Sequence, residues 1–313
     1  MTVAHDMGGE GASPPPSLSA IQFRMMSSIV ANVVVQGVLT GLVYGLMALG
    51  LSVIFGVVRV VNFAHGEFAV IGMYAAFLLF AHYQLDPLIA LVPIAIAFFA
   101  LGYGLQVTLV QRFVGRAEHE QFILLVGLAI IIVNGLLMIF GPDARPANLP
   151  YSFDSFMVGA LIIDKARLYA AIAAVVVAVL LFLFFAYSRT GTAIRACADN
   201  LTGAAVVGLN IKRLYALTFG LGLACVGAAG SLLVTIADAS PSLAPAYTLL
   251  AFTIVIIGGL GSMAGALIGG VLIGISEALA GFFISPSMKS MFSFALLIIV
   301  LVLRPQGIMG RRA

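Results

Sequence analysis

The sequence predicts an all-α membrane protein, a polytopic helix bundle of about 8 to 10 transmembrane segments with broken or re-entrant helices. Composition is the first reason, because hydrophobic residues make up 62% of the 313 residues and charged residues only 9%. A water-soluble protein would carry charge on about a quarter of its residues. The second reason is a recurrence of apolar segments of about 20 residues, the length that crosses the hydrocarbon core of a bilayer. We therefore expect membrane lipid to cover most of the protein.

The apolar segments set the order of the predicted spans. Simple candidates lie at 67–85, 88–110, 121–141, 168–187, 214–236, 264–283 and 288–303. Residues 29–58 are too long for one simple span and short for two, and residues 247–257 are short. Hydropathy therefore leaves the number of crossings open. The Gly- and Pro-containing start predicts a disordered tail over residues 1–27, ahead of a single membrane domain over residues 28–313.

Lys and Arg gather in three of the predicted loops, around residues 112–116, 189–213 and 304–312. Span parity places these loops on the same side of the membrane. Because cytoplasmic loops carry an excess of Lys and Arg, this side is expected to be the cytoplasm. The sequence therefore predicts a cytoplasmic C-terminus. The side of the N-terminus stays open, because the number of crossings within residues 29–58 is open.

No catalytic constellation is present in the sequence. It lacks HExxH, a Walker lysine motif and GxSxG, and its four histidines are scattered. Cys197 and Cys225 are separated by a polar stretch and an apolar span, so they predict neither a disulfide framework nor a metal site. The basic residues are spread over loops, which gives no support to nucleic-acid binding. We expect a protein that is not an enzyme and needs no cofactor.

Polar residues near membrane depth concentrate between Arg59 and Glu67. Ionisable groups within a bilayer are costly enough to count as functional candidates. One interpretation is a structural turn at the water interface. The other is a broken-helix element of a pathway or gate, with Asn62, His65 and Glu67 as candidates. A second turn adds the candidates Gly258, Gly259 and Gly261.

Glycines recur at four-residue spacing on helical faces, as Gly37, Gly41 and Gly45 and as Gly261, Gly265 and Gly269. Such faces permit close helix contact in lipid. Generic packing within the chain is one interpretation, and a subunit interface or moving gate is the other.

The polar loop 188–213 predicts a short helix outside the membrane. Asp199 or Asn200 can cap this helix, residues 204–207 can form its body, and Gly208 can end it. A plain connector at the lipid headgroups is one interpretation. The other is a coupling helix that docks into a groove of a cytosolic partner. The candidate docking residues are Arg195, Asp199, Asn200, Gly203, Ala204, Ala205, Gly208 and Asn210.

Four stretches make the chain recognisable: GLVYGLMALGLSVIFGVVRVVNFAHGEF at 41–68, RTGTAIRACADNLTGAAVVGLN at 189–210, GGLGSMAGALIGG at 258–270 and RPQGIMGRR from 304. In this order they resemble the LivH-type permeases of branched-chain amino-acid ABC importers. The resemblance covers residues 29–312. This chain departs from typical members at Leu250, near which they carry a Lys.

The resemblance implies a permease subunit that moves small amino acids, branched-chain ones first, across a bacterial inner membrane by ATP-driven alternating access. It implies as partners a second homologous permease subunit, two cytosolic ATP-binding subunits and a periplasmic solute-binding protein. The departure at Leu250 leaves urea, amides and aromatic acids as alternative substrates. The rival function is a stand-alone secondary transporter or channel in which Arg59, His65, Glu67 and Glu277 couple transport to protons.

Overall fold

The computed structural model describes residues 18–310 of the chain. Its α-helices are α1 (Leu18–Val58), α2 (His65–Tyr83), α3 (Pro87–Thr108), α4 (Glu118–Phe140), α5 (Lys165–Tyr187), α6 (Arg189–Asp199), α7 (Leu201–Val206), α8 (Ile211–Leu233), α9 (Ala244–Gly258), α10 (Met263–Phe283) and α11 (Lys289–Leu303). Short 3-10 helices are η1 (Val110–Arg112), η2 (Pro241–Leu243) and η3 (Pro286–Met288). Within the described range, nine helices are long and apolar enough to cross a membrane. This confirms the predicted polytopic helix bundle.

The first helix settles one point that the sequence left open and corrects one expectation. α1 continues without a break over 41 residues, so residues 29–58 form one helix rather than two crossings. At 1.5 Å per residue it is about 61 Å long, about twice the hydrocarbon thickness of a bilayer. It begins at Leu18, so residues 18–27 are helical rather than part of a disordered tail. Residues 1–17 lie outside the described residues.

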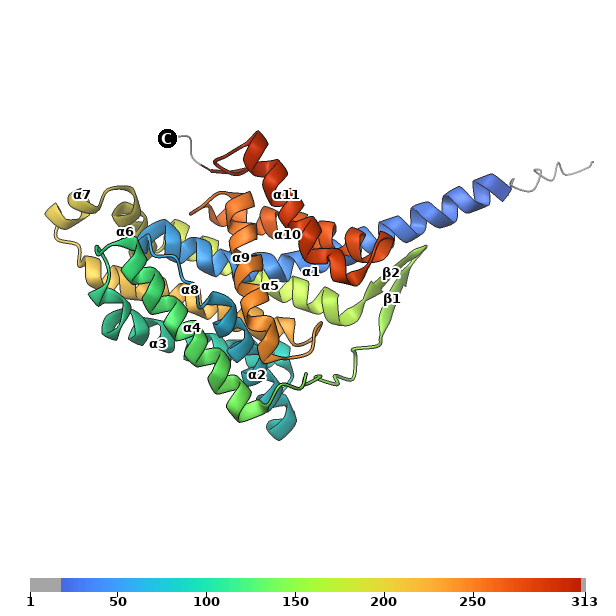
Figure 1. Cartoon of the computed structure of the whole chain (residues 1–313), viewed down its shortest axis with the longest axis horizontal. Coiled ribbons are helices and arrows are strands. Elements are labelled where there is room, and N and C mark those ends of the chain that lie inside the picture. Colours follow the sequence, from blue (N-terminus) through green and yellow to red (C-terminus); the bar gives the residue numbers. More distant parts are fainter. Residues whose placement is uncertain (1–17, 311–313) are drawn as a thin grey trace, which may run out of the picture.

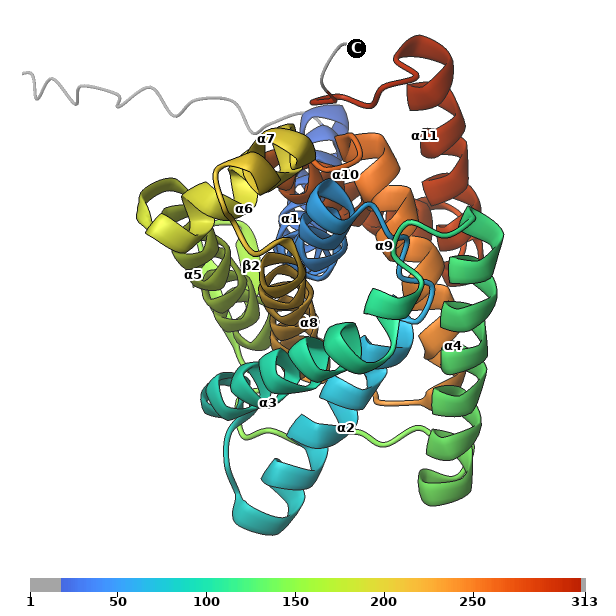
Figure 2. The same cartoon turned by 90° about the vertical axis from the view of Figure 1, so that its left-hand side faces the viewer.

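The helices surround α1, which lies near the centre of the bundle (Figure 2). α1 packs on α10 and α8, and α3 packs on α8. α1 and α8 are mostly buried, because neighbouring helices surround them, whereas α4 and α11 lie at the periphery and are mostly exposed. Burial of these central helices places the core along α1.

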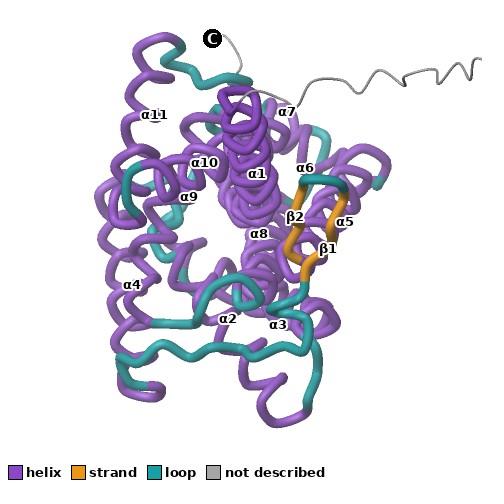
Figure 3. Tube along the Cα trace, turned by 90° about the vertical axis from the view of Figure 1, so that its right-hand side faces the viewer, coloured by secondary structure: helices purple, strands orange, loops and turns teal. Residues whose placement is uncertain are grey.

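The bundle has two distinct ends (Figure 1). One end carries α6, α7 and the start of α4, and we call it the α6–α7 end. The other carries a hairpin of strands β1 (Ser155–Val158) and β2 (Leu161–Asp164), and we call it the hairpin end (Figure 3). The side chain of Asn32 on α1 holds this hairpin, donating to the carbonyl of Ala160 (3.0 Å) and accepting from the N–H of Ile162 (2.6 Å).

The repeated glycines bring helices of this same chain together. A Cβ on Gly37 would lie 2.8 Å from the carbonyl oxygen of Gly274, and one on Gly41 would lie 2.6 Å from that of Gly270. A Cβ on Gly269 would lie 2.6 Å from the carbonyl oxygen of Ile254 on the neighbouring helix α9. The backbones of α1 and α10 therefore touch directly, as small residues permit. For these glycines, packing within the chain is the interpretation that the structure confirms.

Candidate functional site

The chain between α1 and α2 turns back into the bundle. Arg59 ends α1 with a left-handed φ of 56°, and no helix follows until His65. His65 Nε2 lies 2.9 Å from the carbonyl oxygen of Met47. Met47 is about 16 Å inside the end of α1 at 1.5 Å per residue. α2 therefore begins deep in the bundle, and residues 59–64, the re-entrant segment, are a break at depth rather than a turn at its surface.

Side chains of the re-entrant segment alternate between two environments. One set is buried in the protein: Val60, Asn62 and Ala64. The other set lines a cavity: Arg59, Val61 and Phe63. Irregular backbone at membrane depth is tolerated where it is buried in protein or lines a water-filled cavity, and this segment does both.

The predicted pathway residues Asn62, His65 and Glu67 lie on the buried side. Asn62 Oδ1 accepts a hydrogen bond of 3.1 Å from a backbone N–H of the same segment. Thr248 Oγ1 on α9 accepts from the N–H of Gly66 (2.8 Å) and donates to Glu67 Oε2 (2.7 Å). These bonds hold the start of α2 against α1 and α9, and none of the three predicted residues lines the cavity. Sequence reasoning did not single out Thr248.

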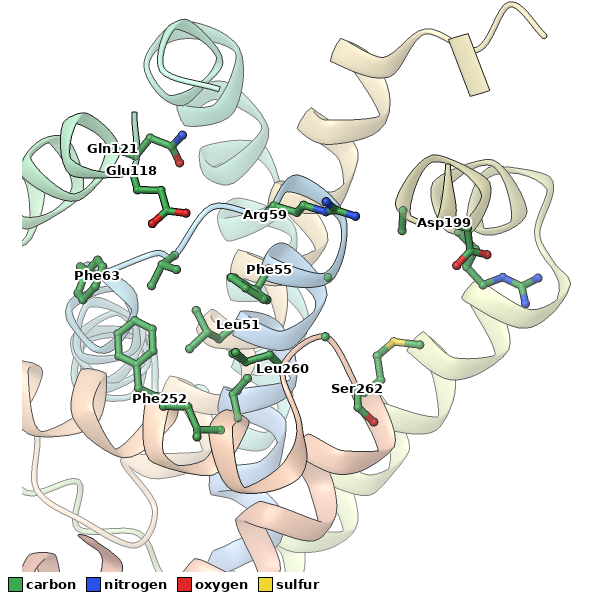
Figure 4. Close-up of a pocket in the computed structure, with 18 of the residues that line it drawn as sticks. Leu51, Phe55, Arg59, Phe63, Glu118, Gln121, Asp199, Phe252, Leu260 and Ser262 are labelled. Carbon is green, nitrogen blue, oxygen red and sulfur yellow. The ribbon is translucent and has the colours of Figure 1, made fainter. Parts of the chain in front are cut away.

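The cavity has a volume of about 1530 Å³ and lies at the α6–α7 end (Figure 4). Its apolar lining consists of Leu51, Phe55, Val61, Phe63, Phe122, Phe252, Val255, Ile256 and Leu260 among others. Charged and polar residues also line it, including Arg59, Glu118, His119, Gln121, Arg195, Asp199 and Ser262. All four fully charged residues among them are exposed. The cavity thus combines apolar walls with charges that water reaches.

The three candidate glycines at the turn between α9 and α10 have two different surroundings. Gly261, with φ +80°, lines the cavity. Gly259, with φ +104°, lies against Gly310, and a Cβ on Gly258 would overlap the carbonyl group of Gly265. The N–H groups of residues 308 and 309 donate to the end of α9 at 2.8 and 3.0 Å. Gly258 and Gly259 therefore permit close backbone packing, whereas Gly261 borders the cavity.

The loop between α5 and α8 contains two helices, α6 and α7. Asn200 caps α7 by accepting a backbone N–H at 2.8 Å, and Gly208 follows the helix with φ +82°, which confirms the predicted cap and end. Asp199 is instead the last residue of α6. Ser188 caps α6 and Asn210 caps α8. The sequence did not predict α6 as a separate helix.

The surface of α7 differs from the predicted docking face at one position. Ala204 is only 4% exposed, because α7 packs on α6 and on α8. Gly203 and Ala205 are exposed, and Val206 and Val207 are 82% and 75% exposed. The outward face of α7 is therefore small and apolar. Of the other predicted docking residues, Arg195 and Asp199 border the cavity. The rest are exposed: Asn200, Gly208 and Asn210.

A helix bundle with nine membrane-length helices, a re-entrant segment and a large cavity that opens at one end defines a polytopic membrane transport protein. Among the described residues, no group of three or more His, Cys, Asp or Glu residues is placed to hold a metal ion. Residues 33–301 match the model of the family described as the permease component of branched-chain amino-acid transport systems. The chain belongs to this family, whose members are transport subunits rather than enzymes.

Individual relatives agree with the family. The chain is 34% identical to the high-affinity branched-chain amino-acid transport system permease protein LivH of Salmonella typhimurium, over 88% of this chain and 94% of the relative. It is 32% identical to the corresponding protein BraD of Pseudomonas aeruginosa, with the same coverage. A probable LivH of Methanocaldococcus jannaschii is 27% identical, over 85% of this chain and 88% of the relative. No solved structure matches the chain.

Proposed function

We propose that the chain is a permease subunit of a binding-protein-dependent ABC importer. It translocates small amino acids, branched-chain ones first, across a bacterial inner membrane by ATP-driven alternating access. The cavity is the observation that carries this proposal. Its apolar walls suit an aliphatic side chain, and the exposed charges of Arg59 and Glu118 suit the carboxylate and amino groups of an amino acid. The names of the relatives point to the same substrate class.

We propose the cytoplasm as the location of the α6–α7 end and of the C-terminus. The excess of Lys and Arg in the three basic loops supports this orientation. In this orientation the cavity opens to the cytoplasm and is the inner part of the translocation pathway. Because the sequence has no phosphate loop, ATP hydrolysis falls to two cytosolic ATP-binding subunits. A second homologous permease subunit and a periplasmic solute-binding protein complete the proposed assembly.

The loop carrying α6 and α7 is the proposed contact with the ATP-binding subunits. The exposed Val206 and Val207 can enter an apolar groove, and Ala205 permits close approach. α6 borders the cavity through Arg195 and Asp199. Movement of α7 by a bound ATPase would therefore pass through α6 to the cavity wall.

The docking step can be tested by replacing Val206 with Asp. A charge at a docked apolar position is expected to weaken ATPase binding by about 2 kcal/mol, or about 30-fold. Val158→Asp is the matched control, because Val158 is also exposed (60%) but lies at the hairpin end. Co-purification and substrate-stimulated ATP hydrolysis are the measurements. Full assembly and coupling of the Val206→Asp protein would make the loop a connector only.

Transport itself is tested in proteoliposomes that contain the complete assembly and the solute-binding protein. Leucine uptake should require ATP and should stop when ATP is removed. Uptake that continues without ATP under a proton gradient would favour the proton-coupled secondary transporter instead. Competition by unlabelled leucine, urea, a short amide and an aromatic acid then identifies the substrate class.

A further inference from the structure

Three phenylalanine rings meet at one end of the cavity. Phe63 comes from the re-entrant segment, Phe122 from α4 and Phe252 from α9. The ring centroids of Phe63 and Phe122 are 4.6 Å apart in an edge-to-face arrangement, and those of Phe63 and Phe252 are 5.0 Å apart. In Figure 4, Phe63 and Phe252 lie together, away from Arg59. We call Phe63, Phe122 and Phe252 the aromatic cluster.

The aromatic cluster lies at the deep end of the cavity. Phe63 is the last lining residue before α2, and Phe252 is the lining residue of α9 farthest from the α9–α10 turn. Phe122 is the lining residue farthest along α4 from its start. Each of the three elements therefore contributes its deepest lining side chain to the same contact.

The three rings belong to elements that are held with different strength. The start of α2 is fixed by the bonds of Thr248 to Gly66 and Glu67, which also tie it to α9. α4 has only three buried residues, at positions 125, 129 and 136, and Phe122 itself is 45% exposed. Toward the hairpin end, α4 is held by stacking of Phe140 on Tyr74 of α2, with centroids 4.1 Å apart. α4 is therefore less buried within the chain than α2 and α9, which makes it the candidate for the moving member.

We propose that the aromatic cluster is the gate of the inner cavity, and that it opens when α4 carries the Phe122 ring away from Phe63. This inference rests on the proposed function, since it assigns a role to the end of the proposed pathway. Apolar constrictions close a pathway by excluding water and ions. The same rings give an aliphatic side chain an apolar surface on which to pass. The gate therefore favours solutes with an apolar side chain over ions and water.

A cysteine placed just behind the gate can report whether the gate is closed. Val126 lies one helical turn beyond Phe122 on the same face of α4, and it does not line the cavity. The Val126→Cys protein is prepared with Cys197 and Cys225 replaced by Ala. Everted membrane vesicles with the full-length chain are treated with a charged, membrane-impermeant methanethiosulfonate. Gln121→Cys, which lines the cavity before the gate, is the reporter of access to the cavity itself.

With the cluster intact, Gln121→Cys should react quickly and Val126→Cys slowly. Phe122→Ala or Phe252→Ala should raise the reaction rate of Val126→Cys at least tenfold and leave that of Gln121→Cys unchanged. The two variants alter different helices, so a folding defect in one leaves the other as a test. Phe282→Ala is the matched control, because Phe282 contacts Phe283 outside the cavity, with ring centroids 5.1 Å apart. This variant should change neither rate.

Fast reaction of Val126→Cys with the cluster intact would overturn the gate. The gate would also be overturned if Val126→Cys reacted slowly and neither Phe122→Ala nor Phe252→Ala changed its rate. An equal increase of that rate with Phe282→Ala would overturn it as well. The labelling requires neither ATP nor substrate. Failure of the proposed function would appear separately, as absent ATP-driven uptake by the unmodified assembly.

Discussion

Replacing Thr248 with Val should destabilise the packing of α2 on α9. The Thr248 side chain is buried, and its hydroxyl serves both Gly66 and Glu67, at 2.8 and 2.7 Å. Valine has nearly the same shape, so the substitution removes the hydroxyl without opening a cavity. The N–H of Gly66 and the carboxyl group of Glu67 would then remain buried without these partners.

The cost follows from the two bonds. A buried N–H left without a partner costs about 1–3 kcal/mol, and a lost hydrogen bond to a charged group costs about 1.5–3 kcal/mol. Together they predict a loss of about 2.5–6 kcal/mol in the free energy of unfolding, and the upper figure assumes that nothing rearranges. Whole domains are stable by only about 5–15 kcal/mol. Thr248→Val should therefore be among the more damaging single substitutions that preserve shape.

Unfolding in SDS, followed by far-UV circular dichroism, measures this change. Thr248→Ser is the control, because it keeps the hydroxyl and loses one methyl group at a cost of about 1 kcal/mol. The double variant with Glu67→Gln gives the coupling energy between the two side chains. If Thr248→Val and Thr248→Ser unfold at the same SDS fraction, the hydroxyl does not hold α2 and this account of the re-entrant segment is refuted.

Other predictions follow from backbone strain, glycine packing and a buried thiol. Arg59→Gly should stabilise the fold by about 1 kcal/mol, because glycine adopts the left-handed φ without strain. It should nevertheless lower leucine uptake as much as Arg59→Ala does. Equal melting temperatures of the Arg59→Gly protein and the unmodified protein would contradict the strain. Gly270→Ala should destabilise the fold, because the added Cβ would overlap the backbone of Gly45. Gly135→Ala should stabilise the fold by about 0.5–1 kcal/mol, because the added Cβ would meet open space. Thermal unfolding in detergent measures both changes. Burial raises the pKa of the Cys197 thiol, so less thiolate is present at pH 8. Alkylation of Cys197 should therefore be slower than that of free cysteine and should become faster as the pH rises. Mass spectrometry of the Cys225→Ala protein measures the alkylation rate, and a rate equal to that of free cysteine would count against this prediction.

Local signals made much of the fold predictable. Long apolar runs predict spanning helices wherever the chain meets lipid, so the bundle could be expected from composition and segment length. Asn200 and Gly208 act on the backbone within a few residues of themselves, which is why the limits of α7 could be read from the sequence. The polar stretch from Arg59 to Glu67 likewise marked the break between α1 and α2.

Contacts between distant segments could not be predicted in the same way. The direction in which Asn62 and His65 point depends on how residues 59–64 run along α1, and the role of Thr248 depends on α9 lying beside α2. Burial of Ala204 depends on the fold of its whole loop. The aromatic cluster joins residues from three elements that are far apart in the chain. None of these placements leaves a signal in local spacing.

Buried and cavity-lining side chains alternate along the re-entrant segment, so its packing depends more on its length than on the identity of most of its residues. Deletion of one residue between Arg59 and His65 would shift the phase of the segment, because its neighbouring side chains point in turn to the core and to the cavity. Asn62 would then face the cavity, and Phe63 would be driven into the core beside α1. We therefore expect this short segment to accept substitutions at Val61 far more readily than any insertion or deletion.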